Sequence, residues 1–302
     1  MIDILLATYN GAAYIREQID SILQQTVADW HLLVHDDGST DGTVDIVREY
    51  VQADKRIRLV EDGERHLGVA KNFLHLLKYS TAEYAMFCDQ DDVWIDNKVE
   101  VMLGVIADKD NTRPQAVFSN AYLWNAEQGV LSDKNTLTYP RTLEALLFLN
   151  TGIQGAASIF NAKMREFLLV PLRAYAMHDH VLTLTAITFG EVDYVDRPLM
   201  YYRQHDRNVT GNAPGSMMNK LRLMKQHAHI PVVDRTHYEG VAAFYEAFKE
   251  KMPMSKRKVF EVFLSLPKLS VWKRVYLIVK HRFMLFDSTA LLLAKMCVRK
   301  FY

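Results

Sequence analysis

The run Tyr84-Ala85-Met86-Phe87-Cys88-Asp89-Gln90-Asp91-Asp92-Val93-Trp94 points most directly to a fold class. Its first five residues are apolar or aromatic, which is typical of a short buried β-strand. Three carboxylates follow this strand at once. Because open α/β sheets bind ligands outside the carboxyl ends of their strands, we expect Asp89, Asp91 and Asp92 to line a ligand-binding crevice.

Upstream of this run, apolar segments at residues 2–7, 30–35 and 58–60 are expected to form three more strands. Apolar residues recur at three- and four-residue spacing between the first two of them, and again after Asp41, which can cap the second helix. A further helix is expected over residues 70–79. This alternation predicts βαβ units and an α/β fold with a mainly parallel sheet.

Downstream of the run, Asp96 can cap a helix that carries Val99 and Met102. Strands are then expected near residues 116–119, 156–160 and 194–202. Beyond Gly211 and Pro214 the pattern is helical throughout. We therefore expect one domain over residues 1–212 and a helical extension over residues 213–302.

The composition is that of a globular protein. Of 302 residues, 49% are apolar and 24% are charged, so a full core is available and wholesale disorder is excluded. Cys88 and Cys297 are too few for a disulfide framework or a four-cysteine zinc site, and they fit a reducing compartment. Since the chain opens without a secretory leader pattern, we expect a cytoplasmic location.

The formal net charge of zero conceals a strong asymmetry. Residues 251–302 contain 12 Lys and Arg against Glu261 and Asp287, which gives +10 and leaves −10 for residues 1–250. This basic segment is rich in apolar and aromatic residues but lacks the roughly 18 uncharged residues of a spanning helix, so helices lying in the membrane headgroup region are expected. The alternative is helices packed on the protein with a solvated basic face; nucleic acid is not an expected partner.

Three motifs follow one another, each after an expected strand. They are Thr8-Tyr9-Asn10-Gly11, His35-Asp36-Asp37-Gly38-Ser39-Thr40-Asp41-Gly42-Thr43 and Asp89-Gln90-Asp91-Asp92-Val93-Trp94. In this order and spacing they resemble the family 2 glycosyltransferases. The resemblance covers about residues 1–210 and implies the GT-A fold, a Rossmann-like mixed sheet flanked by helices that binds a nucleotide diphosphate sugar.

Two later strings, His178-Asp179-His180 and Tyr201-Tyr202-Arg203-Gln204-His205, look like those of the bacterial rhamnosyltransferase-like branch. That resemblance implies sugar transfer from a dTDP or UDP sugar, with dTDP-rhamnose the leading choice. It also implies a glycan or lipid-linked acceptor, a role in cell-surface polysaccharide biosynthesis, and work at the inner face of the cell membrane.

A diphosphate leaving group needs a cation to stabilise its developing negative charge. Mg²⁺ and Mn²⁺ prefer oxygen ligands, so Asp89, Asp91 and Asp92 are the predicted metal ligands, with Asp92 the first choice. The resemblance adds His205. Capping of the next helix would be an alternative use of these carboxylates, but Asp96 is already available for it.

The resemblance also implies contacts with the donor. Asp37 would accept a hydrogen bond from a pyrimidine ring, Tyr9 would stack near the base, Asp91 would contact the ribose, and Arg203 would meet the diphosphate. The alternative for the second motif is turn formation, for which its glycines are well suited and in which Asp36 is expected to serve.

Transfer with inversion needs one general base to take the proton of the acceptor hydroxyl, and Asp179 is the predicted base. The branch carries an aromatic pair after this aspartate, whereas this chain has His180 and Val181. The alternative is that Asp179 only caps the following helix.

Two other classes of protein stay open on the residues alone. A sugar-nucleotide nucleotidyltransferase would use a similar sheet and carboxylates, but it would want a glycine-rich phosphate loop, and residues 8–11 contain one glycine. A non-catalytic carbohydrate- or membrane-binding module could keep the fold, although the intact aspartate cluster argues against it.

Overall fold

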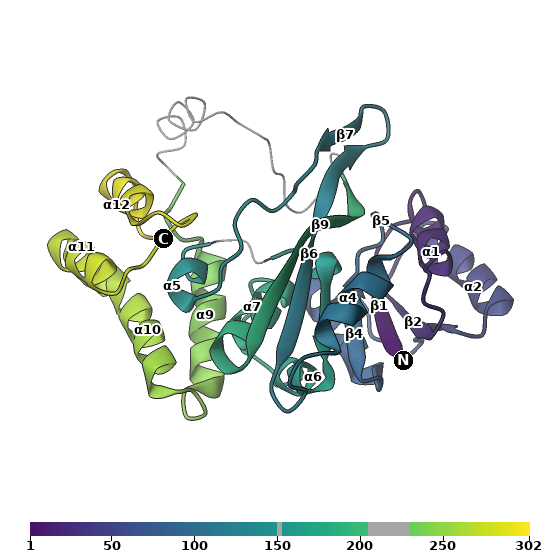
Figure 1. Cartoon of the computed structure of the whole chain (residues 1–302), viewed down its shortest axis with the longest axis horizontal. Helices are drawn as coiled ribbons and strands as arrows, with labels where there is room; N and C mark the ends of the chain where they lie inside the picture. Colours follow the sequence, from purple (N-terminus) through teal and green to yellow (C-terminus); the bar gives the residue numbers. More distant parts are fainter. Residues whose placement is uncertain (150–152, 205–229) are drawn as a thin grey trace. The chain divides into compact units, whose positions relative to one another are not determined.

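The computed structural model describes residues 1–149, 153–204 and 230–302 (Figure 1). These residues form two compact units. The first contains residues 1–137, 153–171 and 177–204, and the second contains 138–149, 172–176 and 230–302. The expected boundary at residues 212–213 lies outside the described residues.

Within the described chain, the strands of the first unit form one mixed nine-stranded sheet in the order β3-β2-β1-β4-β8-β6-β9-β5, with β7 beside β6. The strands are β1 (Ile2–Thr8), β2 (Trp30–Asp36), β3 (Ile57–Leu59), β4 (Tyr84–Cys88), β5 (Val93–Trp94), β6 (Gln115–Asn125), β7 (Gly129–Ser132), β8 (Ser158–Asn161) and β9 (Glu191–Arg203). Strands β1 to β4 are parallel to one another, whereas β8 runs antiparallel to both β4 and β6. The expected α/β sheet is confirmed.

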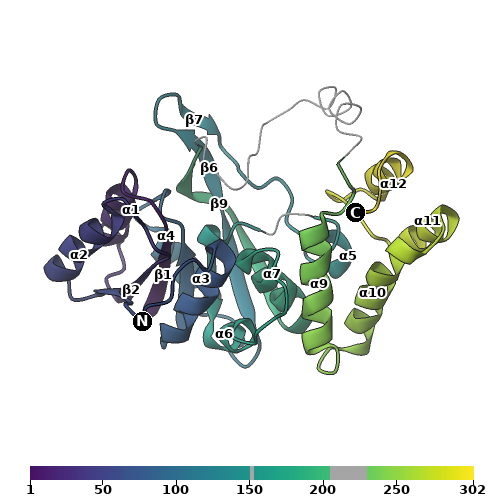
Figure 2. The same cartoon turned by 180° about the vertical axis from the view of Figure 1, so that it is seen from behind.

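Helices cover both faces of this sheet. They are α1 (Ile15–Leu23), α2 (Thr43–Ala53), α3 (Val69–Leu76), α4 (Lys98–Ile106), α6 (Ala162–Leu168) and α7 (His178–Phe189), with short 3-10 turns η1 (Leu77–Tyr79) and η2 (Gly155–Ala157). Figure 1 shows α4 in front of the strands, and the reverse view in Figure 2 shows α3, α6 and α7 on the opposite face. Both faces of β4 are therefore buried, which explains its continuous apolar run.

Two expected helix caps are wrong. Helix α2 has Gly42, not Asp41, at its N-cap, although Asp41 accepts a hydrogen bond from the Thr43 N–H at 3.0 Å. Helix α4 has Asn97, not Asp96, at its N-cap, and no side chain caps it. The backbone carbonyl of Asp96 instead accepts a hydrogen bond from the Thr26 N–H at 2.8 Å. The reason is that Asp96 belongs to the turn that leaves β5, one residue too early to cap the helix.

The second unit is helical, as expected for the end of the chain. It contains α5 (Leu143–Leu146), α9 (Arg235–Phe248), α10 (Met254–Ser265), the 3-10 turn η3 (Leu266–Lys268), α11 (Val271–Lys280) and α12 (Thr289–Val298). Phe148 lies at the centre of its core, with its ring edge-on to those of Phe263, Phe283 and Phe301. Among the described helices, none combines the length and the hydropathy needed to cross a membrane.

Candidate functional site

The register of the parallel strands brings three of the motifs to one edge of the sheet. Thr8 at the end of β1 pairs with Asp36 at the end of β2, and Leu6 of β1 pairs with Cys88 at the end of β4. The residues that follow these strands, Tyr9, Asp37 and Asp89, therefore leave the sheet at the same edge. Because β8 is antiparallel to β4, its preceding turn η2 lies at this edge as well.

Gln90 ties the first motif to the third. The Tyr9 N–H donates to Gln90 Oε1 at 2.9 Å, and Gln90 Nε2 donates to the Tyr9 carbonyl at 3.0 Å. A Cβ on Gly11 would lie 2.2 Å from Gln90 Oε1, so the glycine is needed for this close approach. In the sequence, the only signal for a role of Gln90 is its position between two aspartates.

Asp92, two residues after Gln90, is fully buried. Its Oδ1 accepts a hydrogen bond from the Arg203 backbone N–H at 3.2 Å, and its Oδ2 has no hydrogen-bond partner among the described residues. Burial, with the negative charges of Asp89 and Asp91, raises the pKa of Asp92 well above its usual range. An unpartnered buried carboxylate oxygen beside two more carboxylates is a donor set that suits a hard divalent cation.

Asp89 interacts electrostatically with both Asp91 and Asp179. Burial raises the pKa of Asp89 to about 7, and the charges of Asp91 and Asp179 add to the rise. The four carboxylates therefore lie close enough to influence one another, although β4 and α7 are far apart in the sequence. Negative charge gathered in this way favours a bound cation.

Lys98 brings a buried amino group next to the acidic cluster. Its Nζ donates to the Ala156 carbonyl at 2.5 Å and lies 3.8 Å from the centroid of the Trp94 ring. Burial lowers the pKa of Lys98 to about 7, against the attraction of Cys88, Asp92 and Asp89. The sequence gives no signal for the burial of Lys98, because a lysine at the start of a helix is usually solvated.

Asp179 lies in the first turn of α7. The N-cap is Met177, so the alternative that Asp179 caps this helix is not what the structure contains. Burial raises the pKa of Asp179 to about 7, although hydrogen bonds from the backbone of His180 and Gly155 act in the opposite direction. Its Oδ1 lacks a hydrogen-bond partner within the described chain, which leaves that oxygen available to accept a proton.

His178 fixes the position of this helix start. Its ring packs 4.0 Å from that of Phe73 and 4.7 Å from that of Phe87, measured between centroids. Burial lowers the pKa of His178 to about 3, so the ring is neutral. A Cβ on Gly155 would lie 2.5 Å from His178 Nε2, so Gly155 allows η2 to pack directly against α7.

The two adjacent aspartates of the second motif have different roles. Asp36 accepts hydrogen bonds from Thr8 Oγ1 and from Ser39, and so builds the turn, as expected. Asp37 is buried, and it accepts hydrogen bonds from the N–H groups of Leu67 and Gly68 at 2.7 and 2.8 Å. Asp37 thus anchors the loop before α3, and each of its oxygens keeps a second lone pair.

Tyr9 and Arg203 differ in exposure. Tyr9 is 52% exposed, so its ring is accessible at the sheet edge. The Arg203 guanidinium is buried: its Nε donates to the Asp91 carbonyl at 2.8 Å, it forms an ion pair with Glu17, and it lies 4.3 Å from the Trp124 ring centroid. Arg203 therefore joins β9 to residues 89–92, the acidic connection that follows β4. His205 lies outside the described residues.

A separate cluster joins His35, Asp62 and His75, whose potential ligand atoms lie within 4.8 Å of one another. Its carboxylate is already engaged, since Asp62 accepts from Tyr79 Oη at 2.6 Å, from His75 and from the Glu64 N–H. Burial opposes ionisation, yet the hydrogen bonds from Tyr79 and His75 hold the pKa of Asp62 well below its usual range. These contacts account for the cluster as a hydrogen-bond network that joins β2 to α3.

The chain is similar in sequence to known proteins. The family model described as glycosyl transferase family 2 matches residues 3–166. The dTDP-rhamnosyl transferase RfbG of Shigella flexneri is 28% identical over 222 residues, which cover 68% of this chain and 73% of that protein.

Two solved structures are similar in fold. The S. aureus TarS fragment 1–349 in complex with UDP-GlcNAc superposes with a TM-score of 0.54 at 16% identity, over 91% of this chain and 83% of that one. The mannosyltransferase PcManGT of Pyrobaculum calidifontis, in complex with GDP-Man and Mn²⁺, gives 0.55 at 20% identity, over 92% and 73%. Since the family model spans more than half of the chain and the fold is that of these enzymes, this protein belongs to glycosyl transferase family 2 and is a glycosyltransferase with the GT-A fold.

Proposed function

We propose that this enzyme transfers a sugar, with inversion and with the help of a divalent metal, from a pyrimidine nucleotide diphosphate sugar to an acceptor hydroxyl. The observation that carries the proposal is the meeting of Asp89, Asp91 and Asp92 with Asp179 at one sheet edge, with buried Asp92 Oδ2 and Asp179 Oδ1 unpartnered in the described residues. One carboxylate set would hold the cation and the separate carboxylate would take the proton.

Asp92, Asp91 and Asp89 are the proposed metal ligands, with Mg²⁺ or Mn²⁺ supplying charge stabilisation to the departing diphosphate. Asp179 is the proposed base. As the acceptor oxygen forms its bond to the anomeric carbon, the bond from that carbon to the phosphate oxygen breaks, and Asp179 takes the hydroxyl proton. The sugar is transferred with inverted configuration and the nucleoside diphosphate is released.

Asp37 and Tyr9 are the proposed contacts for the base of the nucleotide, and Asp91 for the ribose. Asp37 keeps acceptor capacity for a ring N–H, and the exposed Tyr9 ring is free for stacking. Arg203 remains a proposed contact of the diphosphate, although its backbone and ion-pair contacts favour a positioning role for it. His205 remains a proposed metal ligand.

For the donor we propose dTDP-rhamnose, on the similarity to a dTDP-rhamnosyl transferase. The proposed acceptor is a glycan or lipid-linked glycan in bacterial cell-surface polysaccharide assembly, with the basic helical unit in peripheral contact with the inner face of the membrane. Membership of family 2 favours this over a sugar-nucleotide nucleotidyltransferase.

The test compares thermal stability with UDP, dTDP, GDP and CDP, each with and without Mn²⁺. A ligand at 100 times its dissociation constant adds about 2.7 kcal/mol to the free energy of unfolding. A metal-dependent shift with one pyrimidine nucleotide, followed by transfer from its rhamnosyl derivative with an inverted anomeric signal in the product, would support the proposal. A folded protein that no nucleotide stabilises, and that neither transfers nor hydrolyses a nucleotide sugar, would instead be a binding module.

A further inference from the structure

Helix α11 exposes an apolar face that its own unit leaves uncovered. Trp272 is 85% exposed, Tyr276 60% and Val279 52%. These residues are spaced i, i+4 and i+7, so they share one face of the helix, and Val271, which is 53% exposed, lies at its start. Ile278, on another side of α11, is buried and holds the helix against the unit. Trp272, Tyr276 and Val279 form what we call the α11 face.

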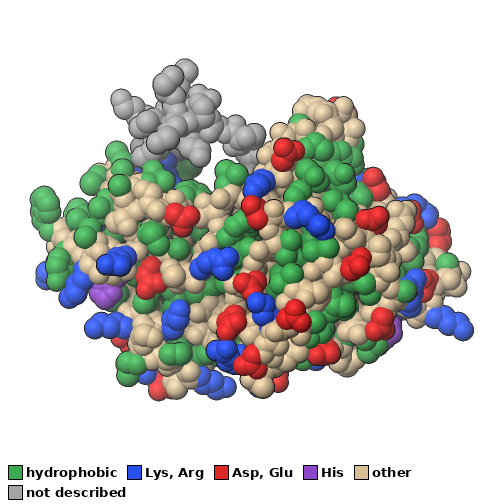
Figure 3. All heavy atoms as spheres, viewed as in Figure 1, with side chains coloured by type: hydrophobic (Ala, Val, Ile, Leu, Met, Phe, Trp, Pro, Cys, Tyr) green, Lys and Arg blue, Asp and Glu red, His purple; other side chains and the backbone are tan. Residues whose placement is uncertain are grey.

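Positive charge borders the α11 face. Lys273 and Lys280 are exposed, and Lys280 Nζ lies 5.4 Å from the centroid of the Tyr276 ring. Residues 271–302 contain seven Lys and Arg but only one acidic residue, Asp287. In the space-filling view, hydrophobic and basic side chains lie side by side over the surface of this unit (Figure 3).

Arg274 behaves differently from these lysines. Its Nε donates to the Leu266 carbonyl and its Nη2 to the Pro267 carbonyl, each at 2.8 Å. It therefore fixes α11 against η3, while the α11 face is left outward on the unit. Arg274 thus stabilises the packing of α11 on η3, whereas the exposed Lys280 lies beside the exposed ring of Tyr276.

We infer that the α11 face is a docking surface for an anionic phospholipid membrane. A helix with aromatic and aliphatic residues on one face and lysines beside them lies in the plane of the interface, with its rings among the headgroups and its ammonium groups on the phosphates. The absence of a spanning helix among the described residues agrees with peripheral contact. This inference deepens the proposed membrane contact of the enzyme by naming the surface that makes it.

The first experiment uses the full chain with vesicles of phosphatidylcholine containing phosphatidylglycerol, against vesicles of phosphatidylcholine alone. Co-sedimentation is expected with the anionic vesicles and is expected to fall at high salt, because exposed charges are screened. Trp272→Ala should weaken the partition by about tenfold. Met254→Ala, which removes a 77% exposed side chain from α10 of the same unit, should leave it unchanged.

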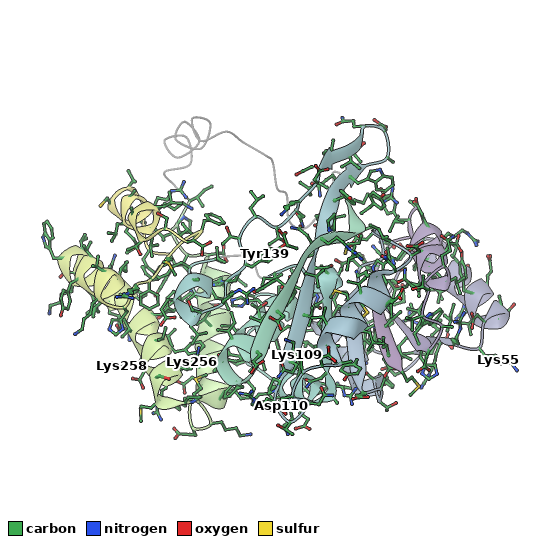
Figure 4. The ribbon with its side chains drawn as sticks, viewed as in Figure 1. Lys55, Lys109, Asp110, Tyr139, Lys256 and Lys258 are labelled. Carbon is green, nitrogen blue, oxygen red and sulfur yellow. The ribbon has the colours of Figure 1, made fainter. Side chains whose placement is uncertain are left out.

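A pair of charge variants separates the α11 face from general basicity. Lys273→Gln with Lys280→Gln should weaken binding to anionic vesicles by about 10- to 30-fold. The matched control removes the same charge from α10 through Lys256→Gln with Lys258→Gln (Figure 4) and should weaken it far less. Equal losses in both pairs would overturn the assignment to α11.

Fluorescence gives an independent reading of depth. The chain has four tryptophans, of which Trp30 and Trp94 are buried and Trp124 is half-buried, so a blue shift on vesicle binding should vanish in Trp272→Ala. Light scattering tests whether a second copy of the chain, rather than a membrane, covers the α11 face. If Trp272→Ala converts an oligomer to a monomer, the inference fails.

The outcome is separable from that of the proposed function. The α11 variants should keep the wild-type thermal shift with nucleotide and Mn²⁺ in the absence of lipid. Loss of vesicle binding with intact nucleotide binding tests the docking surface alone. Vesicle binding by a protein that binds no nucleotide would leave the docking surface standing and remove the transferase proposal.

Discussion

Asp92 and Asp179 are the two residues whose chemistry bears most directly on the proposal, and each combines burial with an unpartnered oxygen among the described residues. Their surroundings differ. Asp92 has Asp89 and Asp91 beside it and a backbone N–H on Oδ1, whereas Asp179 lies in the first turn of a helix beside a neutral histidine. This division suits one carboxylate to a cation and the other to a proton.

Asp92→Asn should abolish the metal-dependent stabilisation by nucleotide and lower kcat by about two to three orders of magnitude, because the departing diphosphate loses its charge stabilisation. Thermal shift and a transfer assay measure the two effects. Asp96→Asn is the matched control, since Asp96 is exposed just after the same connection and caps no helix. Metal-dependent nucleotide binding that survives in Asp92→Asn would remove Asp92 from the ligand set.

Asp179→Asn should lower kcat by about 10²- to 10⁴-fold while the nucleotide affinity stays near wild type. The base works when deprotonated, and its pKa is raised to about 7, so wild-type kcat should rise with pH up to about 7 and then level off. A pH profile of the wild-type enzyme and of the residual activity of the variant checks this. A variant that keeps the same rising limb would show that another group is the base.

The same pKa has a consequence for stability. Since folding raises the pKa of Asp179 from 3.8 to about 7, the folded state binds more protons than the unfolded state between these values. The contribution of Asp179 to stability is therefore full below pH 3.8 and is lost as the pH rises towards about 7. Asp179→Asn should lack this contribution to the slope, as denaturant titrations at several pH values would measure.

At the scale of elements, a few side-chain hydrogen bonds hold the strand ends at the candidate site together. The carboxyl end of β1 and the acidic connection after β4 are held together by the reciprocal hydrogen bonds of Gln90 with Tyr9. The end of β9 is held to the same connection by Arg203. These contacts connect segments that are about 80 to 110 residues apart in the sequence. Substitutions at them therefore test how the elements are assembled.

Gly11→Ala should destabilise the protein by about 1–3 kcal/mol, because its Cβ would collide with Gln90 Oε1. It should also weaken nucleotide binding by displacing Tyr9. Gly42→Ala is the matched control, since nothing lies within 4 Å of its Cβ position. In the double variant Gly11→Ala with Gln90→Ala the collision is removed, so the two stability changes should be non-additive; simple additivity would argue against the contact.

The whole molecule consists of two units with separate cores. The first surrounds the sheet, and the second surrounds the aromatic cluster of Phe148, Phe263, Phe283 and Phe301. The second also includes residues 138–149, which are far in sequence from its other helices. The net charge of +10 in residues 251–302 belongs to this unit.

Phe148→Ala should destabilise the second unit by about 3–5 kcal/mol, because it leaves a cavity among three aromatic rings. Hydrogen exchange should lose protection in residues 230–302, while nucleotide binding by the first unit persists. Met254→Ala is the control, as its exposed side chain fills no core. Equal loss of protection in both units would mean that they unfold as one.

Local patterns predicted the longer strands and most helices of the first unit and brought the three carboxylates together, but they did not predict β5, β7, α5 or α6. Strands lie where apolar runs predict them, at residues 2–7, 30–35 and 84–88. The reason is that a strand buried on both faces of the sheet is apolar along its whole length. Asp89, Asp91 and Asp92 follow from the rule that parallel strands present their carboxyl ends together. The helical character of the last 70 or so residues also follows from periodicity.

The close contacts of the site required the assembled chain. No local sequence pattern predicts the hydrogen bonds between Gln90 and Tyr9 or the burial of Lys98 beside Trp94. The same holds for the hydrogen bond from Arg203 to the Asp91 carbonyl. The same is true of the failed cap at Asp96, which depends on where β5 turns. Periodicity and turn chemistry act over a few neighbouring residues, whereas which side chain fills a buried gap or loses its water is decided by segments that meet only after the sheet has formed.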